Sequence, residues 1–221
     1  MTTSRRSLLA AGATGTLAVT SGCLDVVFGG EPLEFDAGRV APTDAALADT
    51  GYEVDETDQR SVEQTISVGV DRQVRGSFWS STYTKRREHE GELRDASLFA
   101  AISLPGMKAV GHSVNPLDGM SSEELLEEIL ERVDGTYGSI KDVTHEESFS
   151  LEILEAGREV DVFVGETEFE GERVEVDVTI TSFDHEDDLL VLVGSHPDLL
   201  AEESANLELL MESVEHPVDD E

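Results

Sequence analysis

Hydrophobic and polar residues alternate along much of the second half of the chain. From position 174 to 180 every second residue is Val or Ile, while Glu175, Asp177 and Thr179 stand between them. This alternation predicts an antiparallel strand over 173–183 with one buried side and one solvent-facing side. Similar apolar segments at 143–154, 158–169 and 189–194 complete a predicted meander of four strands, with turns at 170–172 and 184–188.

Other segments have helical spacing or are rich in β-forming residues. Ser121 and Glu124 form a capping-box pattern at the start of a predicted amphipathic helix over 121–133. A short helix is predicted before Gly51, with Thr43 or Asp44 as its N-cap. A closing helix is predicted over 198–214. Strands are expected in the first half of the chain at 61–70, 73–86, 97–104 and 107–113.

The order of these elements predicts an α+β fold, an antiparallel sheet with helices packed on it. The 221 residues are enough for one domain with a sizeable core. We divide the chain into a signal peptide (1–22), a lipid-anchored tether (23–32), one acidic domain (33–216) and an acidic tail (217–221).

The first 23 residues resemble an export signal. Arg5 and Arg6 stand before an apolar segment over 8–19, which is too short to span a membrane as a helix. Thr20-Ser21-Gly22 then precedes Cys23, the one cysteine in the chain, in a pattern that resembles a lipobox. The pattern predicts twin-arginine export and lipidation of Cys23. The alternatives are a disordered N-terminus with two chance arginines, and a buried or free thiol.

The charge is strongly one-sided. The chain has 49 Asp and Glu against 15 Lys and Arg, a formal net charge of −34 and a pI near 4.2. Such a charge indicates either disorder or a folded domain with an acidic surface, and the hydrophobic content of 38% favours the folded domain. Few lysines and many carboxylates are typical of proteins from high salt, where surface repulsion is screened. Nucleic acid is excluded as a partner because no basic face is expected.

Residues with catalytic or metal-binding chemistry are scattered. The chain lacks the spacing of a zinc site, the loop of an EF-hand, a nucleophile elbow and a phosphate-binding loop. We therefore predict no catalytic residues, no metal and no cofactor, although a composite site assembled by folding remains an alternative. The histidines that could contribute to one are His89, His112, His145, His185, His196 and His216.

One patch differs from the acidic background. An aromatic strand leads into a basic cluster, which could face lipid headgroups or a partner. The alternative is an aromatic strand packed in the core, followed by a basic segment that offsets nearby acids. The candidate patch consists of Trp79, Tyr83, Lys85, Arg86 and Arg87.

Several soft motifs resemble a family of uncharacterised haloarchaeal lipoproteins that carry a domain of unknown function. Besides Arg5, Arg6, Cys23 and Tyr83, they are Thr50-Gly51-Tyr52, Asn115-Pro116-Leu117, the step from Gly194 to Pro197, and Val214-Glu215-His216-Pro217. The resemblance implies an exported, membrane-attached domain in a halophile and no known activity. The order of elements also resembles a Mog1/PsbP-like α/β sandwich, which is an analogy of fold alone.

These observations favour a lipid-anchored domain on the extracytoplasmic face of the cell membrane that binds a protein or a small molecule and is not an enzyme. A metal-assisted hydrolase is the alternative, and it requires two or three histidines close to one another and to a carboxylate. A structural component of the envelope is a third candidate.

Overall fold

The computed structural model describes residues 33–67, 71–89, 92–106, 108–109, 112–113, 117, 119–132, 140–169 and 172–218. The chain divides into two compact units, Met1–Leu33 with Gln64–Val74, and Glu34–Glu63 with Arg75–Glu221. Within the first unit, the described residues belong to the ends of three strands. The second unit contains the two hydrophobic cores of the described structure and the candidate functional residues.

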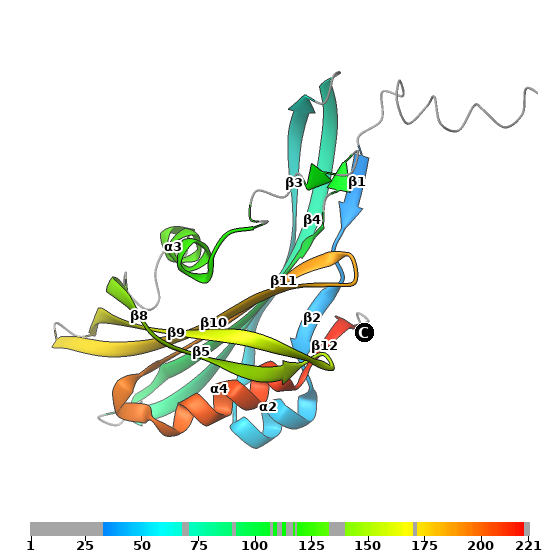
Figure 1. Cartoon of the computed structure of the whole chain (residues 1–221). Coiled ribbons are helices and arrows are strands. Elements are labelled where there is room, and N and C mark those ends of the chain that lie inside the picture. The colour runs from blue at the N-terminus through cyan, green and yellow to red at the C-terminus, as the bar shows by residue number, and fades with distance from the viewer. Residues whose placement is uncertain are drawn as a thin grey trace, which may run out of the picture. The chain divides into compact units, whose positions relative to one another are not determined.

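An eight-stranded mixed sheet is the main element of the structure (Figure 1). Its order is β1-β4-β5-β11-β10-β9-β8, with β3 paired to β4 off this path. Two small ladders, β12 with β2 and β6 with β7, complete the pairing. The strands are β1 (Leu33–Asp36), β2 (Arg39–Pro42), β3 (Glu53–Ser67), β4 (Asp71–His89), β5 (Glu92–Pro105), β6 (Lys108–Ala109), β7 (His112–Ser113), β8 (Lys141–Ile153), β9 (Ala156–Phe169), β10 (Glu172–His185), β11 (Asp188–Pro197) and β12 (Val214–Val218).

The helices among the described residues are short. They are α2 (Asp44–Thr50), α3 (Ser122–Arg132) and α4 (Glu202–Glu212), with a 3₁₀ turn η1 (Asp198–Leu200) before α4. Strands account for 68% of the structure and helices for 21%. The fold is therefore β-rich, and the predicted α+β class, with its Mog1/PsbP-like sandwich, is wrong.

Two segments account for much of the difference between the predicted α+β class and the observed β-rich fold. From Glu53 to Glu63, β3 has mainly exposed, polar side chains, so it has no hydrophobic alternation and forms by pairing with β4. The predicted closing helix is shorter than expected because η1 occupies its beginning. The last residue of the predicted helix, Val214, is the first residue of β12, in which Val214 pairs with Pro42 and Glu215 pairs with Ala41.

Local signals in the sequence predicted several elements correctly. Thr43 Oγ1 accepts a hydrogen bond from the backbone N–H of Ala46 at 3.3 Å, and Gly51 ends α2 with a φ of 75°. Ser121 Oγ accepts from the backbone N–H of Glu124 at 3.3 Å, while Glu124 Oε2 accepts from that of Ser121 at 2.9 Å. The predicted capping box is confirmed, and the four meander strands follow their predicted order.

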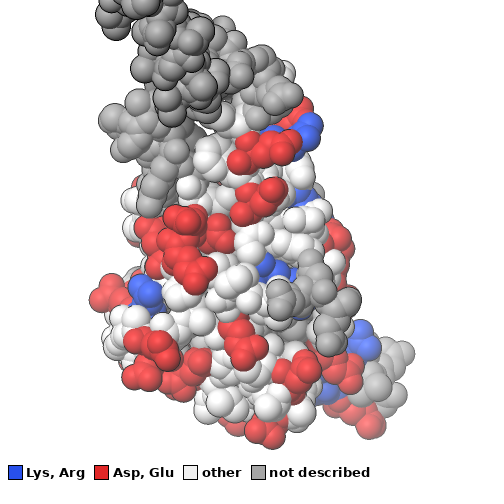
Figure 2. All heavy atoms as spheres, turned by 90° about the vertical axis from the view of Figure 1, so that its right-hand side faces the viewer, with Lys and Arg blue, Asp and Glu red and all other residues white. Residues whose placement is uncertain are grey.

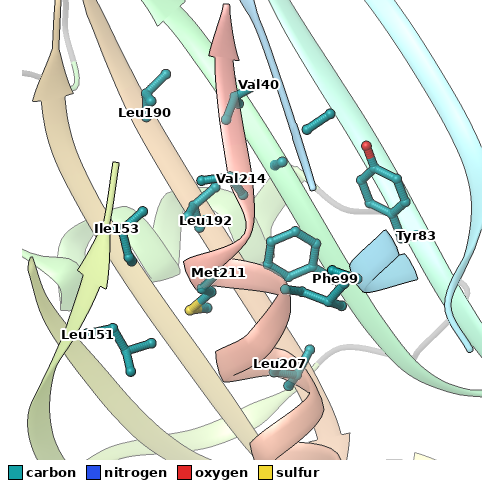
Figure 3. Packing of buried hydrophobic residues seen from close by; sticks show 14 of the residues in the cluster. Val40, Tyr83, Phe99, Leu151, Ile153, Leu190, Leu192, Leu207, Met211 and Val214 are labelled. Carbon is teal, nitrogen blue, oxygen red and sulfur yellow. The ribbon is translucent and has the colours of Figure 1, made fainter. Parts of the chain in front are cut away.

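The larger core lies between α4 and one face of the sheet (Figure 3). Leu207, Leu210 and Met211 of α4 are at most 1% exposed. Burial of such side chains stabilises the fold by about 1.5–3 kcal/mol each. The sheet and the β2–β12 ladder supply the side chains around them, among which are Val40, Tyr83, Phe99, Leu151, Ile153, Leu190, Leu192 and Val214.

A second core lies on the other face of the sheet, under α3. Leu125 and Leu126 of α3 pack in one cluster with Phe163 of β9, Val178 of β10 and Val191 of β11. The central strand β11 is thus buried on both faces, and nearly every residue in it is inaccessible. The side of β10 expected to face solvent is exposed at Arg173 and Glu175, but farther along the strand it is buried, with Thr181 only 1% exposed.

Gly194 permits the close approach of α4 to β11. A Cβ atom at this position would lie 2.7 Å from Leu207 Cδ1 and 2.8 Å from Leu207 Cδ2. Because Leu207 is itself 1% exposed, it has little space to move away. The absence of a side chain at position 194 therefore sets how deeply Leu207 enters the core.

We expect Gly194→Ala to lower the free energy of unfolding by about 1–3 kcal/mol, as overpacking does. Leu207→Ala should lower it by about 2–5 kcal/mol through the cavity it leaves. The double variant should lose less than the two single variants together, because the added methyl group enters that cavity. Urea denaturation of the four proteins measures this coupling.

Gly157→Ala is the matched control on β9. A Cβ there would meet Ser150 Oγ at 3.5 Å, an ordinary contact. Its effect should stay within about 0.5 kcal/mol. Additive losses in the double variant would contradict the close approach of Leu207 to position 194.

Candidate functional site

The residues of the predicted export signal and anchor lie outside the described residues. Arg5, Arg6 and Cys23 all precede Leu33, where the described structure begins. The twin-arginine signal and the lipidation of Cys23 therefore stay predictions. The functional candidates within the described structure are the basic and aromatic patch on β4 and three carboxylates that accept several hydrogen bonds, those of Glu203, Asp188 and Asp161.

The five patch residues have different environments along β4. Tyr83 is 2% exposed, and its ring centre lies 6.0 Å from that of Phe99. Trp79 is half-buried and Arg86 is exposed. Lys85 and Arg87 follow Tyr83 at alternate positions and so extend on the same side of the strand. That side faces α4, and both cations reach one buried carboxylate.

Glu203, in the first turn of α4, is this carboxylate, and its side chain is fully buried. Its Oε1 lies 2.8 Å from Lys85 Nζ and 2.7 Å from Arg87 Nη2. Its Oε2 accepts hydrogen bonds from Asn206 Nδ2 at 3.0 Å and from the Tyr52 hydroxyl at 3.4 Å. The basic end of the patch therefore joins α4 to β4.

The surroundings of Glu203 determine its ionisation. Burial acts to raise the pKa of this carboxyl, because an apolar environment disfavours the charge. Hydrogen bonds from Lys85, Arg87 and Asn206, with the attraction of Lys85, act in the opposite direction and prevail, so the pKa lies below its usual range. Glu203 is thus held as a carboxylate, and a buried carboxylate with two cations is a strong constraint on packing.

Asp188 is a second buried carboxylate with several donors, and it begins β11. Its Oδ2 accepts from the backbone N–H of Gly38 at 2.7 Å and lies 3.1 Å from His216 Nε2. The Ser103 hydroxyl is 3.5 Å from the same oxygen. Asp188 therefore joins the loop before β2 and the strand β12 to the β10–β11 turn. Sequence reasoning placed Asp188 in a solvated turn, because its partners are distant in the chain.

His216 also contacts a second histidine. The ring centres of His185 and His216 are 5.5 Å apart, and the ring planes are inclined by 75°. The hydrolase alternative required histidines close to one another and to a carboxylate, and the structure brings this pair together beside Asp188. Two further histidines lie near other carboxylates. His145 contacts Asp161, and His196 lies near Asp177.

His145, Ser148 and Asp161 form an accessible cluster on β8 and β9. His145 Nε2 lies 3.0 Å from Ser148 Oγ and 3.3 Å from Asp161 Oδ1, and Ser148 Oγ donates to the same oxygen at 2.6 Å. In a nucleophilic triad the imidazole stands between the hydroxyl and the carboxylate. Here both groups meet one carboxylate oxygen, so the hydroxyl proton is held by Asp161.

The pKa of Asp161 reflects these bonds. Burial acts to raise it, but hydrogen bonds from Ser122, Ser148 and His145 prevail and lower it. Since Ser122 begins α3, the cluster joins this helix to the sheet.

Asp177, near His196, has the opposite pKa shift. Burial raises the pKa of the Asp177 carboxyl, although His196 Nε2 lies 3.8 Å from it.

Among the residues that the structure describes, no group of three His, Cys, Asp or Glu side chains is suited to hold a metal ion. In the same part of the chain, none of the helices has the length and apolarity needed to span a membrane.

Residues 39–215 match the family model described as "Domain of unknown function (DUF6517)". The chain belongs to the DUF6517 family. The match covers most of the chain and includes both Glu203 and Asp188, whereas Gly38 and His216 lie immediately outside it. The expected family with a domain of unknown function is confirmed to this extent. A search of curated proteins finds no match.

The DUF6517 domain should depend strongly on Glu203. In Glu203→Gln the charges of Lys85 and Arg87 lose their buried partner, so we expect the free energy of unfolding to fall by about 3 kcal/mol. The control is Glu202→Gln, because Glu202 also pairs with Arg87 at 2.8 Å but its side chain is 60% exposed. That change should cost less than about 1 kcal/mol. Urea denaturation at pH 7 compares the two, and equal losses would contradict the role of Glu203.

The contribution of Glu203 should also depend on pH. Because its pKa is lower in the folded DUF6517 domain than in the unfolded chain, its stabilisation is complete above the ordinary value of about 4.3. It is lost as the pH falls through the lower folded-state value. The stability difference between wild type and Glu203→Gln should therefore be constant from about pH 7 to 5 and shrink below about pH 4. A difference as large at pH 3 as at pH 7 would contradict an ionised Glu203, because the unfolded chain binds the proton of this carboxyl between these two pH values.

Proposed function

We propose that this DUF6517 protein is exported by the twin-arginine route, is anchored by a lipid on Cys23 to the extracytoplasmic face of the cell membrane, and acts there as a binding or accessory domain. The observation that carries this proposal is the order of features in the first 23 residues. An arginine pair, a weakly apolar segment and small residues precede the one cysteine of the chain.

The distance from anchor to domain fits a tethered module. Nine residues, 24–32, separate Cys23 from the start of β1 at Leu33. Fully extended, such a segment spans about 30 Å at most. The DUF6517 domain would then work close to the membrane surface, where tethering raises its effective concentration toward other envelope components.

Three hydrogen-bonded carboxylates join elements of the fold to one another, and this structural role supports a binding function for the domain. Glu203 joins α4 to β4, Asp188 joins β12 to the β10–β11 turn, and Asp161 joins α3 to the sheet. Each of these groups stabilises the scaffold through its hydrogen bonds. A rigid scaffold of this kind suits a domain that presents a surface to a partner.

The surface composition supports adaptation to high salt. On the face shown in Figure 2, Asp and Glu side chains are spread widely and Lys and Arg side chains are few. The formal net charge of −34 produces self-repulsion that salt screens. A haloarchaeal source, as the sequence resemblance implies, would provide such a solvent.

The salt response is a direct test of this adaptation. We expect the midpoint of thermal unfolding to rise between 0.1 and about 2 M KCl, because the Debye length falls from about 10 Å to below about 3 Å. A charge-neutral salt substitute such as glycine betaine, at equal osmolality, is the control for excluded-cosolute effects. Equal stabilisation by both solutes would contradict a dominant role of charge screening.

The anchor is tested by Cys23→Ser in cells of a halophilic host. Wild type should fractionate with membranes in high salt, and the variant should be released, because the thioether cannot form without the thiol. Ser21→Ala is the matched control, since it keeps the small residue before Cys23 and should stay in the membrane. Replacement of Arg5 and Arg6 by lysine should retain the precursor inside the cell. Wild type and Cys23→Ser that are equally soluble inside the cell would overturn the proposal.

A further inference from the structure

We propose that His185 and His216 together bind a divalent transition-metal ion, such as Cu²⁺ or Zn²⁺, and that Asp188 orients His216 for this role. The proposal concerns the β10–β11 turn and β12, and it is independent of the membrane anchor. It begins from a nitrogen atom that the fold buries and leaves without a hydrogen-bond partner.

His216 Nδ1 is that atom. The His216 side chain is 2% exposed, and its Nδ1 has no hydrogen-bond partner among the described residues. Buried polar atoms nearly always have a partner, and an exception calls for an explanation such as an ion. The other ring nitrogen, Nε2, lies 3.1 Å from Asp188 Oδ2.

Asp188 determines which nitrogen of His216 is available. Its Oδ2 also accepts the backbone N–H of Gly38 at 2.7 Å, so the carboxylate has a fixed position as an acceptor. A neutral His216 then carries its proton on Nε2 and has the lone pair on Nδ1. Histidines that bind metals usually donate their other ring N–H to a carboxylate in this way, which fixes the tautomer and raises the basicity of the ligand.

His185 supplies the second imidazole. Its ring centre lies 5.5 Å from that of His216. Two imidazoles bound to one metal ion at about 2.0–2.1 Å place their ring centres about 5–5.5 Å apart at tetrahedral or slightly wider angles. His185 is half-buried, so it joins the buried His216 to the solvent from which an ion would arrive.

The charges around the pair favour a cation. The exposed carboxylates Asp184, Glu186 and Asp187 surround His185 on the same turn. No described group of three side chains is suited to a metal. The proposed site has two imidazole ligands, and water would fill the remaining coordination positions. Imidazole suits Cu²⁺, Zn²⁺ and Ni²⁺, and Cu²⁺ binds most tightly in the usual order of affinities.

Copper titration of the full chain in KCl buffer tests the proposal. Pulsed electron paramagnetic resonance counts the imidazoles on Cu²⁺, and we expect one ion per chain with two of them. His185→Ala should leave one imidazole and weaken binding by at least the 10–100-fold that loss of an orienting partner causes. His145→Ala removes an accessible histidine elsewhere and should change neither result.

A second measurement uses Zn²⁺. The ion should raise the midpoint of thermal unfolding of wild type and of His145→Ala, and the rise should be absent in His185→Ala. Without metal, each of the three proteins should unfold in one cooperative transition, which shows that His185→Ala is folded; the metal effect is the change in each protein's own midpoint. Copper held without imidazole would overturn the proposal, because the 49 carboxylates of the chain would then explain the binding. A two-imidazole signal that persists in His185→Ala would also overturn it, because other histidines of the chain would then be the ligands.

Discussion

The placement of α4 on the sheet is the constraint on which the rest of the structure depends. Two contacts determine it: Leu207 enters the space above Gly194, and Glu203 meets Lys85 and Arg87 of β4. The first contact sets the depth of the helix and the second sets its position along β4. Because an unpaired buried carboxylate is costly, α4 has one favourable position. The larger core and the β12 strand that follows α4 depend on this position.

Asp188 has a comparable role at the other end of this core. It receives donors from the loop before β2 and from β12, which are distant in sequence and pair with each other. One carboxylate thus holds both strands of the small ladder at the β10–β11 turn. The proposed metal site uses the same bond, since the contact that fixes β12 also sets the tautomer of His216. Structure and binding would then share one interaction.

The sequence predicted elements whose signals are local. The caps at Thr43 and Ser121 and the strand predicted over 173–183 depend on neighbours a few residues away, and the structure has all three. The fold class could not be obtained in this way. Between Glu53 and Glu63, β3 lacks a buried face, and β12 exists because β2 is available to pair with it. Glu203 and Asp188 were missed for a related reason: in a chain with 49 acids, a single carboxylate gains significance only from distant donors.

Salt screens the exposed charges of this protein much more than its buried ion pairs. In concentrated salt the exposed carboxylates act over about 3 Å or less, whereas pairs around Glu203 and Asp188 are buried and screened far less. Surface charge can then neither attract a partner over a distance nor determine the fold. For the proposed binding domain in concentrated salt, recognition would come from short-range contacts, which form slowly without electrostatic steering. A lipid anchor on Cys23 would offset this loss, because it confines the domain and its partner to one surface and so raises their effective concentration.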